Sequence, residues 1–260
     1  MSTDAVTVEK RGAVTILRLA QPESMNALSP AIKAGLEAHV PAFFSDTSAR
    51  CLIITGTGKA FSAGGDIRSF EPTARPGVSR ARMARSHIWL EPLLNGEKPV
   101  ITAVNGAAVG AGFGVAMCGD IILAAEDAYF QSGFTMVGAV ADFGLGLTLP
   151  RAIGAVRAKD VLLTNRKVTA AEALAMGMVS RVLPAAELLD QAIDLAEKLA
   201  RGPTISLGLI KSLVNQGNGA TPKAYFNIEA HAQAIAFGSA DFAEGVDAFL
   251  NKRKPAFKGE

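Results

Sequence analysis

The sequence predicts an α/β fold with a strand-and-helix body over residues 1–200 and a helical region over residues 201–260. Short apolar runs without polar alternation recur in the first half, as is typical of strands that are covered on both faces. Glycine-rich loops follow two of these runs. In the last third, apolar residues recur every three or four positions instead, which is the spacing of amphipathic helices.

The N-terminal residues predict a β-hairpin and then a helix. Residues 6–9 and 13–19 alternate apolar with polar side chains, and an Arg-Gly pair lies between them as a turn. Ser29 is a favourable N-cap residue, and Pro30 suits the first position of a helix. We therefore expect a helix to begin at residue 30.

Three apolar runs, residues 51–55, 100–104 and 121–123, are predicted strands. Residues 100–119 contain only two polar side chains, so their length would also admit a membrane-spanning helix. Five glycines in this stretch and the acidic Asp120 directly after it favour a strand, a glycine-rich loop and a buried helix. We therefore expect no membrane segment.

The C-terminal third predicts four helices. The first covers residues 188–199 and ends at a Gly-Pro pair, and the second covers residues 205–213. Thr221 opens the third. Ser239 is the expected cap of a fourth helix, which we expect to end near Pro255.

Composition narrows the possible functions. The residues are 49% hydrophobic and 19% charged, which excludes a disordered chain. A net charge of +2 is too small to indicate a nucleic-acid partner. Cys51 and Cys118 lie in apolar runs, and the N-terminus has no apolar signal-peptide core, so we expect a reducing, cytoplasmic location. The three histidines are far apart in the sequence, so no metal site is expected.

Two glycine-rich loops, residues 56–66 and 105–114, each follow a predicted buried strand. Neither matches a nucleotide-binding motif. Small residues allow a ligand to approach backbone N–H groups, and a helix N-terminus adds positive potential. The loops could aim two N–H groups at one oxygen and so form an oxyanion hole. The alternative is a pair of ordinary tight turns with close helix packing.

Residues 68–85 contain five arginines together with two prolines and a glycine. One interpretation is a solvated surface segment. The other is a flap over a site for a phosphorylated ligand, because arginine binds phosphate groups well.

Asp142 is a single acid within a long apolar run. An unpaired buried carboxylate is costly, so such an acid usually has a partner or a raised pKa. A raised pKa suits a base that must later return its proton. The alternative is that Asp142 is the N-cap of a helix starting at Phe143.

Several motifs together resemble the crotonase family, the enoyl-CoA hydratase/isomerase superfamily, over nearly the whole chain. They are QPESMNALS at 21–29, KAFSAGGDI at 59–67, KPVITAVNG at 98–106, GAG at 110–112, MGMVS at 176–180 and SADFAEG at 239–245. The resemblance implies a spiral of repeated ββα units with a C-terminal helical trimerisation region. It also implies an acyl-CoA substrate and a homotrimer or dimer of trimers.

The resemblance also implies site residues. The backbone N–H groups of Gly65 and Ala111 would form the oxyanion hole. Coenzyme A is part of the substrate, so no separate cofactor is implied. The residues expected along the coenzyme A and thioester path are Glu23, Ser24, Met25, Ala27, Ala63, Asp66 and Ile67. Asp66 has an alternative role as a cap of the helix after its loop.

The family hydratases use two glutamates, and those positions correspond to Gly114 and Phe134 here. Neither residue can carry a proton, so hydration of the family type is poorly supported. We expect these two residues to open an apolar acyl pocket instead.

The family comparison gives Asp142 two possible roles. In the epoxyphenylacetyl-CoA and Δ3,Δ2-enoyl-CoA isomerases an aspartate here moves a proton, and this is the favoured function. In the 4-chlorobenzoyl-CoA dehalogenases it is a nucleophile, with a histidine that corresponds to His87. Hydration and a non-catalytic acyl-CoA-binding or RNA-binding role are the remaining alternatives.

Overall fold

The structure, a computed structural model, describes residues 5–70 and 75–260. Its centre is a six-stranded sheet with the order β1-β2-β3-β5-β7-β10, in which β1 and β2 form an antiparallel hairpin and the other pairs are parallel. The strands are β1 (Val6–Arg11), β2 (Val14–Leu19), β3 (Cys51–Gly56), β5 (Val100–Val104), β7 (Ile121–Ala125) and β10 (Arg181–Leu183). The predicted hairpin and the three predicted strands are confirmed.

A second sheet of four short strands stands beside the first, with the order β4-β6-β8-β9. These strands are β4 (Ala60–Ser62), β6 (Ala107–Val109), β8 (Tyr129–Gln131) and β9 (Val168–Thr169). Strands β3, β5 and β7 are each followed by one short strand of the second sheet and then by a helix. The chain therefore repeats a ββα unit and advances by one strand in both sheets at each turn, as the spiral predicts.

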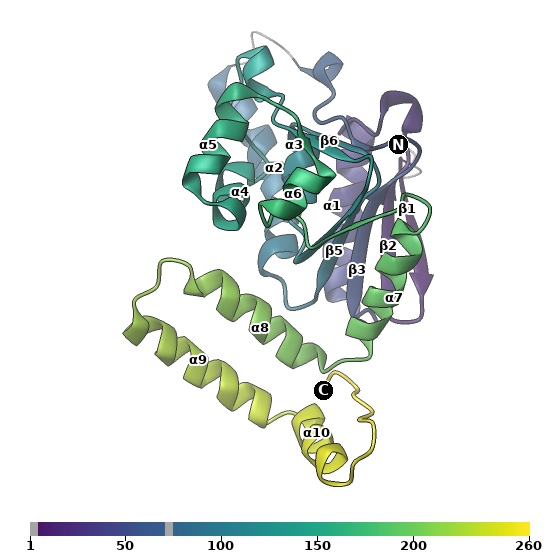
Figure 1. The fold of residues 1–260 in the computed structure, drawn as a ribbon, viewed down its shortest axis with the longest axis vertical. Helices are drawn as coiled ribbons and strands as arrows, with labels where there is room; N and C mark the ends of the chain where they lie inside the picture. The colour runs from purple at the N-terminus through teal and green to yellow at the C-terminus, as the bar shows by residue number, and fades with distance from the viewer. Residues whose placement is uncertain (1–4, 71–74) are drawn as a thin grey trace.

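Helices surround these sheets and extend beyond them. They are α1 (Pro30–Ser45), α2 (Pro76–Asn95), α3 (Ala111–Ala116), α4 (Leu145–Ile153), α5 (Ala155–Thr164), α6 (Ala170–Ala175), α7 (Leu188–Ala200), α8 (Thr204–Gly217), α9 (Pro222–Phe237) and α10 (Ala240–Leu250). In Figure 1, α7 lies in front of the strands and α1 behind them, while α8, α9 and α10 lie below the body.

Local capping chemistry sets several helix starts. The Oγ of Ser29 accepts a hydrogen bond from the N–H of Ile32, and Ser239 and Thr221 cap α10 and α9 in the same way. Such a bond satisfies one of the N–H groups that have no partner within the helix. All three predicted helix starts are confirmed.

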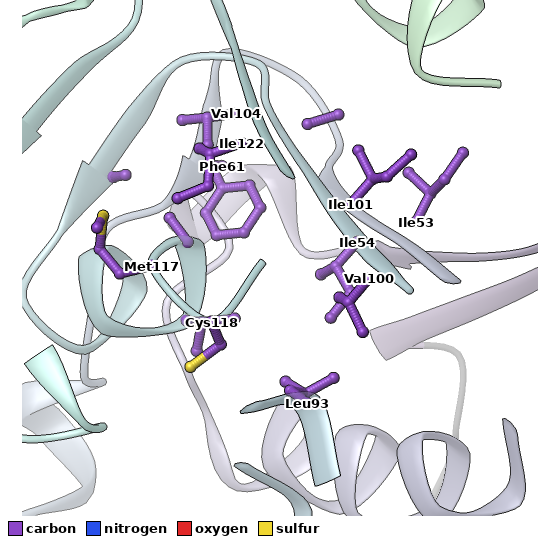
Figure 2. Packing of buried hydrophobic residues seen from close by; sticks show 14 of the residues in the cluster. Ile53, Ile54, Phe61, Leu93, Val100, Ile101, Val104, Met117, Cys118 and Ile122 are labelled. Atoms are coloured by element: carbon purple, nitrogen blue, oxygen red, sulfur yellow. The ribbon is translucent and has the colours of Figure 1, made fainter. Parts of the chain in front are cut away.

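The core lies between the two sheets and the helices that cover them. Figure 2 shows the ring of Phe61 from β4 beside Val104 and Ile122, with Cys118, just after α3, lower in the view. The side chains of β3 and β5 are buried on both faces, apart from the partly exposed Gly56, which explains their continuous apolar sequences. Cys51 and Cys118 are free thiols in this core.

The structure adds a helix that was not predicted and corrects the predicted end of another. Residues 76–95 form the long helix α2, and the earlier part of the arginine segment includes residues 71–74, which lie outside the described residues. The buried side chains of α2 begin only at Ser86, so its first half lacks an apolar stripe. The last helix ends at Leu250 and not near Pro255.

Buried polar contacts hold the C-terminal helices on the body. The Nζ of Lys211 in α8 lies 2.9 Å from a carboxylate oxygen of Asp120, and it donates a hydrogen bond of 2.7 Å to the carbonyl of Leu93. The last residues fold back, and the N–H groups of Lys258 and Gly259 donate to the buried carboxylate of Asp241.

Residues 100–119 are divided among β5, β6 and α3, as expected. Across residues 5–70 and 75–260, every helix is too short or too polar to cross a membrane. Residues 100–119 therefore form a buried strand–loop–helix unit, although their length would also have admitted a membrane-spanning helix.

Candidate active site

The two glycine-rich loops lie against each other at the ends of β4 and β6. These strands pair in parallel, so the segments that follow them leave the sheet side by side. Gly64 has φ +94°, and a Cβ on it would lie 2.6 Å from the carbonyl oxygen of Val109 and 3.4 Å from the backbone nitrogen of Ala111. Only glycine allows this approach, which brings Gly65 and Ala111 together.

The N–H groups of Gly65 and Ala111 are free to bind a ligand. In residues 5–70 and 75–260, neither group donates to a backbone carbonyl or a side chain. Ala111 is the first residue of α3, where helical N–H groups have no partner within the helix. Two such neighbouring donors can bind one carbonyl oxygen and stabilise negative charge on it.

Two asparagines that the sequence analysis did not identify stabilise this region. Asn26 is fully buried, and its side-chain nitrogen donates to the carbonyls of Thr57 and Ala60 at 2.8 Å. Asn105 donates to the carbonyl of Gly58 and accepts from the N–H of Gly56. Their amide groups can donate and accept at once, which allows them to hold the loop between β3 and β4 and the ends of these strands in place.

The residues expected along the coenzyme A path lie in two adjacent segments. The N–H of Ala63 donates to the carbonyl of Met25, and that of Leu28 donates to the carbonyl of Gly64. Met25 and Ile67 are exposed apolar side chains on these segments. The remaining members are Glu23, which is exposed, and Ser24, Ala27, Ala63 and Asp66, which are half-buried.

Asp66 has the capping role that was considered for it. Its Oδ1 accepts a hydrogen bond of 3.2 Å from the N–H of Arg68 at the start of the short 3-10 helix Ile67–Ser69. The carboxylate therefore has a structural partner, and any contact with a ligand would be an additional role.

Gly114 and Phe134 do not open an acyl pocket, and that expectation is wrong. A Cβ on Gly114 would lie 2.6 Å from the Cβ of Phe143 and 3.1 Å from the carbonyl oxygen of Asp142, so the segment 142–143 fills this space. Phe134 is only 8% exposed and belongs to the core. Both residues pack against the protein itself because the chain folds back over α3.

Asp142 lies in this returning segment with an unpartnered oxygen. Its Oδ1 is buried and has no hydrogen-bond partner among the described residues. Burial raises the pKa of this carboxyl from 3.8 to about 6, although the positive charges of Lys33 and Arg82 oppose the rise. The N-cap alternative is wrong, because the residue before α4 is Gly144 and no side chain caps that helix.

Lys33 and Arg82 are site residues that the sequence analysis did not single out. Burial and the positive charge of Arg82 lower the pKa of Lys33, while Asp142 and Asp66 raise it. Lys33 lies in the first turns of α1 and Arg82 lies in α2, so packing of these two helices brings the cations to Asp142. No local sequence pattern relates residues in two separate helices.

His87 is exposed on α2, and the structure gives it no place in the site. Trp89 lies two residues later, about 200° around the helix. The Trp89 ring packs edge-on against the ring of Phe143, with the centroids 5.8 Å apart. The face of α2 toward Asp142 is therefore the Trp89 face, and His87 points away from it.

Several known proteins are similar to this chain in sequence and architecture. The enoyl-CoA hydratase/isomerase family model matches residues 9–260. A 1,2-epoxyphenylacetyl-CoA isomerase of Escherichia coli (strain K12) is 37% identical over 254 residues, covering 96% of this chain and 97% of that protein. A crotonyl-CoA hydratase of Syntrophomonas wolfei is 34% identical over 258 residues, covering 99% of both.

Solved structures agree with the fold. An enoyl-CoA hydratase from Polaromonas sp. JS666 matches with a TM-score of 0.92 and 30% identity, over 97% of this chain and 99% of that one. The ββα spiral, the paired glycine loops and the sequence matches lead to one conclusion. The chain belongs to the crotonase family of enoyl-CoA hydratases and isomerases.

Proposed function

We propose that this protein is an enoyl-CoA isomerase in which Asp142 moves the proton. The observation that carries the proposal is the buried carboxylate oxygen of Asp142, which has no partner among the described residues. The glutamate positions of the family hydratases hold Gly114 and Phe134, so Asp142 is the acid that remains. A pKa of about 6 lets the group accept a proton and release it again near neutral pH.

The reaction would begin with the thioester carbonyl oxygen accepting hydrogen bonds from the N–H groups of Gly65 and Ala111. Ionised Asp142 takes a proton from the α-carbon of a 3-enoyl thioester, and the electron pair moves into a dienolate. The two N–H groups stabilise the negative charge on the thioester oxygen. Asp142, now neutral, returns the proton to the γ-carbon, which leaves a conjugated 2-enoyl thioester.

Hydration is the second candidate, because crotonyl-CoA hydratase is a relative. It would require Asp142 to activate water without a second acid. A glutamate at position 114 has no room beside Phe143, which counts against hydration of the family type. The dehalogenase alternative would require His87, which is exposed on the opposite side of α2 from Trp89.

The remaining features of the function are proposals of the same kind. Coenzyme A would enter as part of the substrate, along Met25, Ala27, Ala63 and Ile67. Exposed apolar side chains on the last two helices, with Phe249 83% exposed, suit subunit contacts in a homotrimer or dimer of trimers. Two free buried thiols agree with a reducing, cytoplasmic location.

A paired assay tests the proposal. Purified wild-type protein and Asp142→Asn receive a 3-enoyl-CoA and, separately, a 2-enoyl-CoA, and the absorbance of the conjugated thioester is followed. The isomerase proposal expects conjugation to form with the wild type and to be lost in the variant. Hydration of the 2-enoyl substrate that does not depend on Asp142 would overturn it.

A further inference from the structure

We infer that Arg82 is a positioning residue. It connects the Phe70 ring, which lies over the backbone donor of Gly65, with the carboxylate of Asp142. This inference rests on the proposed isomerase function, because it assigns Asp142 and Gly65 their roles there. It stands on three structural relationships, which involve Phe70, the Trp89 face of α2, and the charges around Asp142.

The first relationship is that Phe70 covers Gly65. A Cβ on Gly65 would lie 3.1 Å from the Cζ atom and 3.3 Å from the Cε2 atom of the Phe70 ring. The ring edge therefore lies directly over the backbone of the proposed oxyanion donor. An aromatic ring in this position excludes part of the water around the Gly65 backbone, which strengthens a hydrogen bond made there.

The second relationship is the stacking of Arg82 on that ring. The Cζ atom of its guanidinium lies 4.1 Å from the centroid of Phe70, which is a cation–π contact. Arg82 and Trp89 are seven residues apart in α2, so they lie on nearly the same face of the helix. Because Trp89 packs against Phe143, this face is turned toward the segment that carries Asp142.

The third relationship is electrostatic. The charged groups that act on Asp142 are Lys33 from α1 and Arg82 from α2, and Asp66 acts on Lys33. Among the residues that the structure describes, neither Lys33 nor Arg82 has an acidic partner within 4 Å. One helical turn further along both helices, Arg85 pairs with Glu37 at 2.7 Å. Within residues 5–70 and 75–260, the Arg85 turn is thus neutralised by Glu37, whereas the turn with Lys33 and Arg82 has no acidic partner.

The position of Arg82 suits a reaction in which negative charge moves from Asp142 to the substrate. Before proton transfer the negative charge lies on Asp142, and afterwards it would lie on the thioester oxygen that accepts from the Gly65 N–H group. Arg82 contacts the Phe70 ring that lies against Gly65, and its charge acts on Asp142, so that charge is favourable in either state. The residue therefore stabilises the carboxylate and the dienolate without itself exchanging a proton.

The test compares Arg82→Met with Arg85→Met, which removes the neighbouring arginine but leaves the site intact. Carboxyl carbons of aspartate are labelled with 13C, Asp142 is assigned by its absence in Asp142→Asn, and its titration is followed by NMR in the free protein. Arg82→Met should raise the pKa of Asp142 by roughly half a unit or more, and Arg85→Met should leave it unchanged. Arg82→Lys keeps the charge and should restore most of the wild-type pKa.

Activity supplies the second measurement. In Arg82→Met, the acidic limb of the pH profile of kcat/KM for the 3-enoyl-CoA should move to higher pH. At pH 6.5, kcat should fall roughly tenfold. Phe70→Leu should lower kcat without moving the limb. An unchanged Asp142 titration in a folded Arg82→Met protein would overturn the inference. Because the titration needs no turnover, a wild-type protein that fails to isomerise 3-enoyl-CoA would contradict the proposed function only.

Discussion

Gly114 and Phe143 are so close that a Cβ on the glycine would lie 2.6 Å from the Cβ of the phenylalanine. Phe143 also has φ +51°, a left-handed conformation that costs a bulky residue free energy. Its ring is held by Trp89 on the other side. The residue next to Asp142 is therefore fixed from two directions, and this fixes where the carboxylate can lie.

Gly114→Ala is expected to destabilise the protein by about 1–3 kcal/mol, because the backbone of residues 142–143 must move to admit the methyl group. The same shift should lower isomerase kcat at least tenfold by displacing Asp142. Urea unfolding and steady-state assays measure the two effects. Gly146→Ala is the matched control, since a Cβ there meets open space in helix α4 and should not lower stability. Equal effects of both variants would contradict this account.

Hydratase activity should not be created by placing glutamates at positions 114 and 134 together. A glutamate at 114 meets Phe143 in the space where the family hydratases hold an acid. The expected result is a poorly folded protein with no gain in hydration of 2-enoyl-CoA, measured by thermal unfolding and product analysis. A stable double variant that hydrates 2-enoyl-CoA would contradict this account, because residues 142–143 would then have moved aside easily.

Removal of the Asp142 charge should change how stability depends on pH. The folded pKa of about 6 lies above the ordinary 3.8, so wild-type stability falls as pH rises from 4 through 6 and stays reduced above that. Asp142→Asn lacks this loss and should be more stable than wild type by about 1–2 kcal/mol at pH 8, with no gain at pH 4. Denaturant titrations at both pH values measure it. Asp127→Asn, at an exposed acid, should show no such difference.

The Ala111 donor can be removed with little change in helix geometry. Ala111→Pro removes the N–H group at the first position of α3, where proline is tolerated, and puts the ring Cδ atom in place of the hydrogen. We expect kcat to fall by about 10²–10³, the usual loss for one oxyanion donor. Ala111→Gly keeps the N–H group and should retain most of the activity. Similar losses in both variants would argue against an oxyanion role for this residue.

The ion pair of Lys211 and Asp120 should hold α8 against the body. The Lys211 side chain is only 6% exposed, so Lys211→Met leaves an unpaired carboxylate and should cost about 3–5 kcal/mol in unfolding free energy. The exposed pair of Arg201 and Glu197 is the control, and Arg201→Met should cost about 0.5 kcal/mol or less. Denaturant unfolding measures both, and a small loss in Lys211→Met would contradict the assigned role.

Much of the fold could be predicted because its signals are local. A serine or threonine cap acts within three residues, so Ser29, Thr221 and Ser239 were readable from the sequence. The start of α2 was missed because its first half has a weak apolar pattern, and buried side chains begin only at Ser86. The end of α10 was misplaced because the chain turns at Lys252, which has φ +51°, and the Arg253 N–H donates back to the carbonyl of Ala248.

By itself, the sequence determined the strand-and-helix body, the two glycine-rich loops, and Asp142 as the single acid in an apolar run, and its family resemblance implied the ββα spiral. Only the tertiary structure decided that Gly114 has no room for a side chain, that His87 is exposed, and that the charges of Lys33 and Arg82 act on Asp142. Loops and caps depend on neighbouring residues, whereas these contacts depend on how α1, α2 and α3 pack against segments far away in the chain. Asp142 could therefore be identified from the sequence, whereas the charges of Lys33 and Arg82 that act on it could be identified only from the packing of the helices.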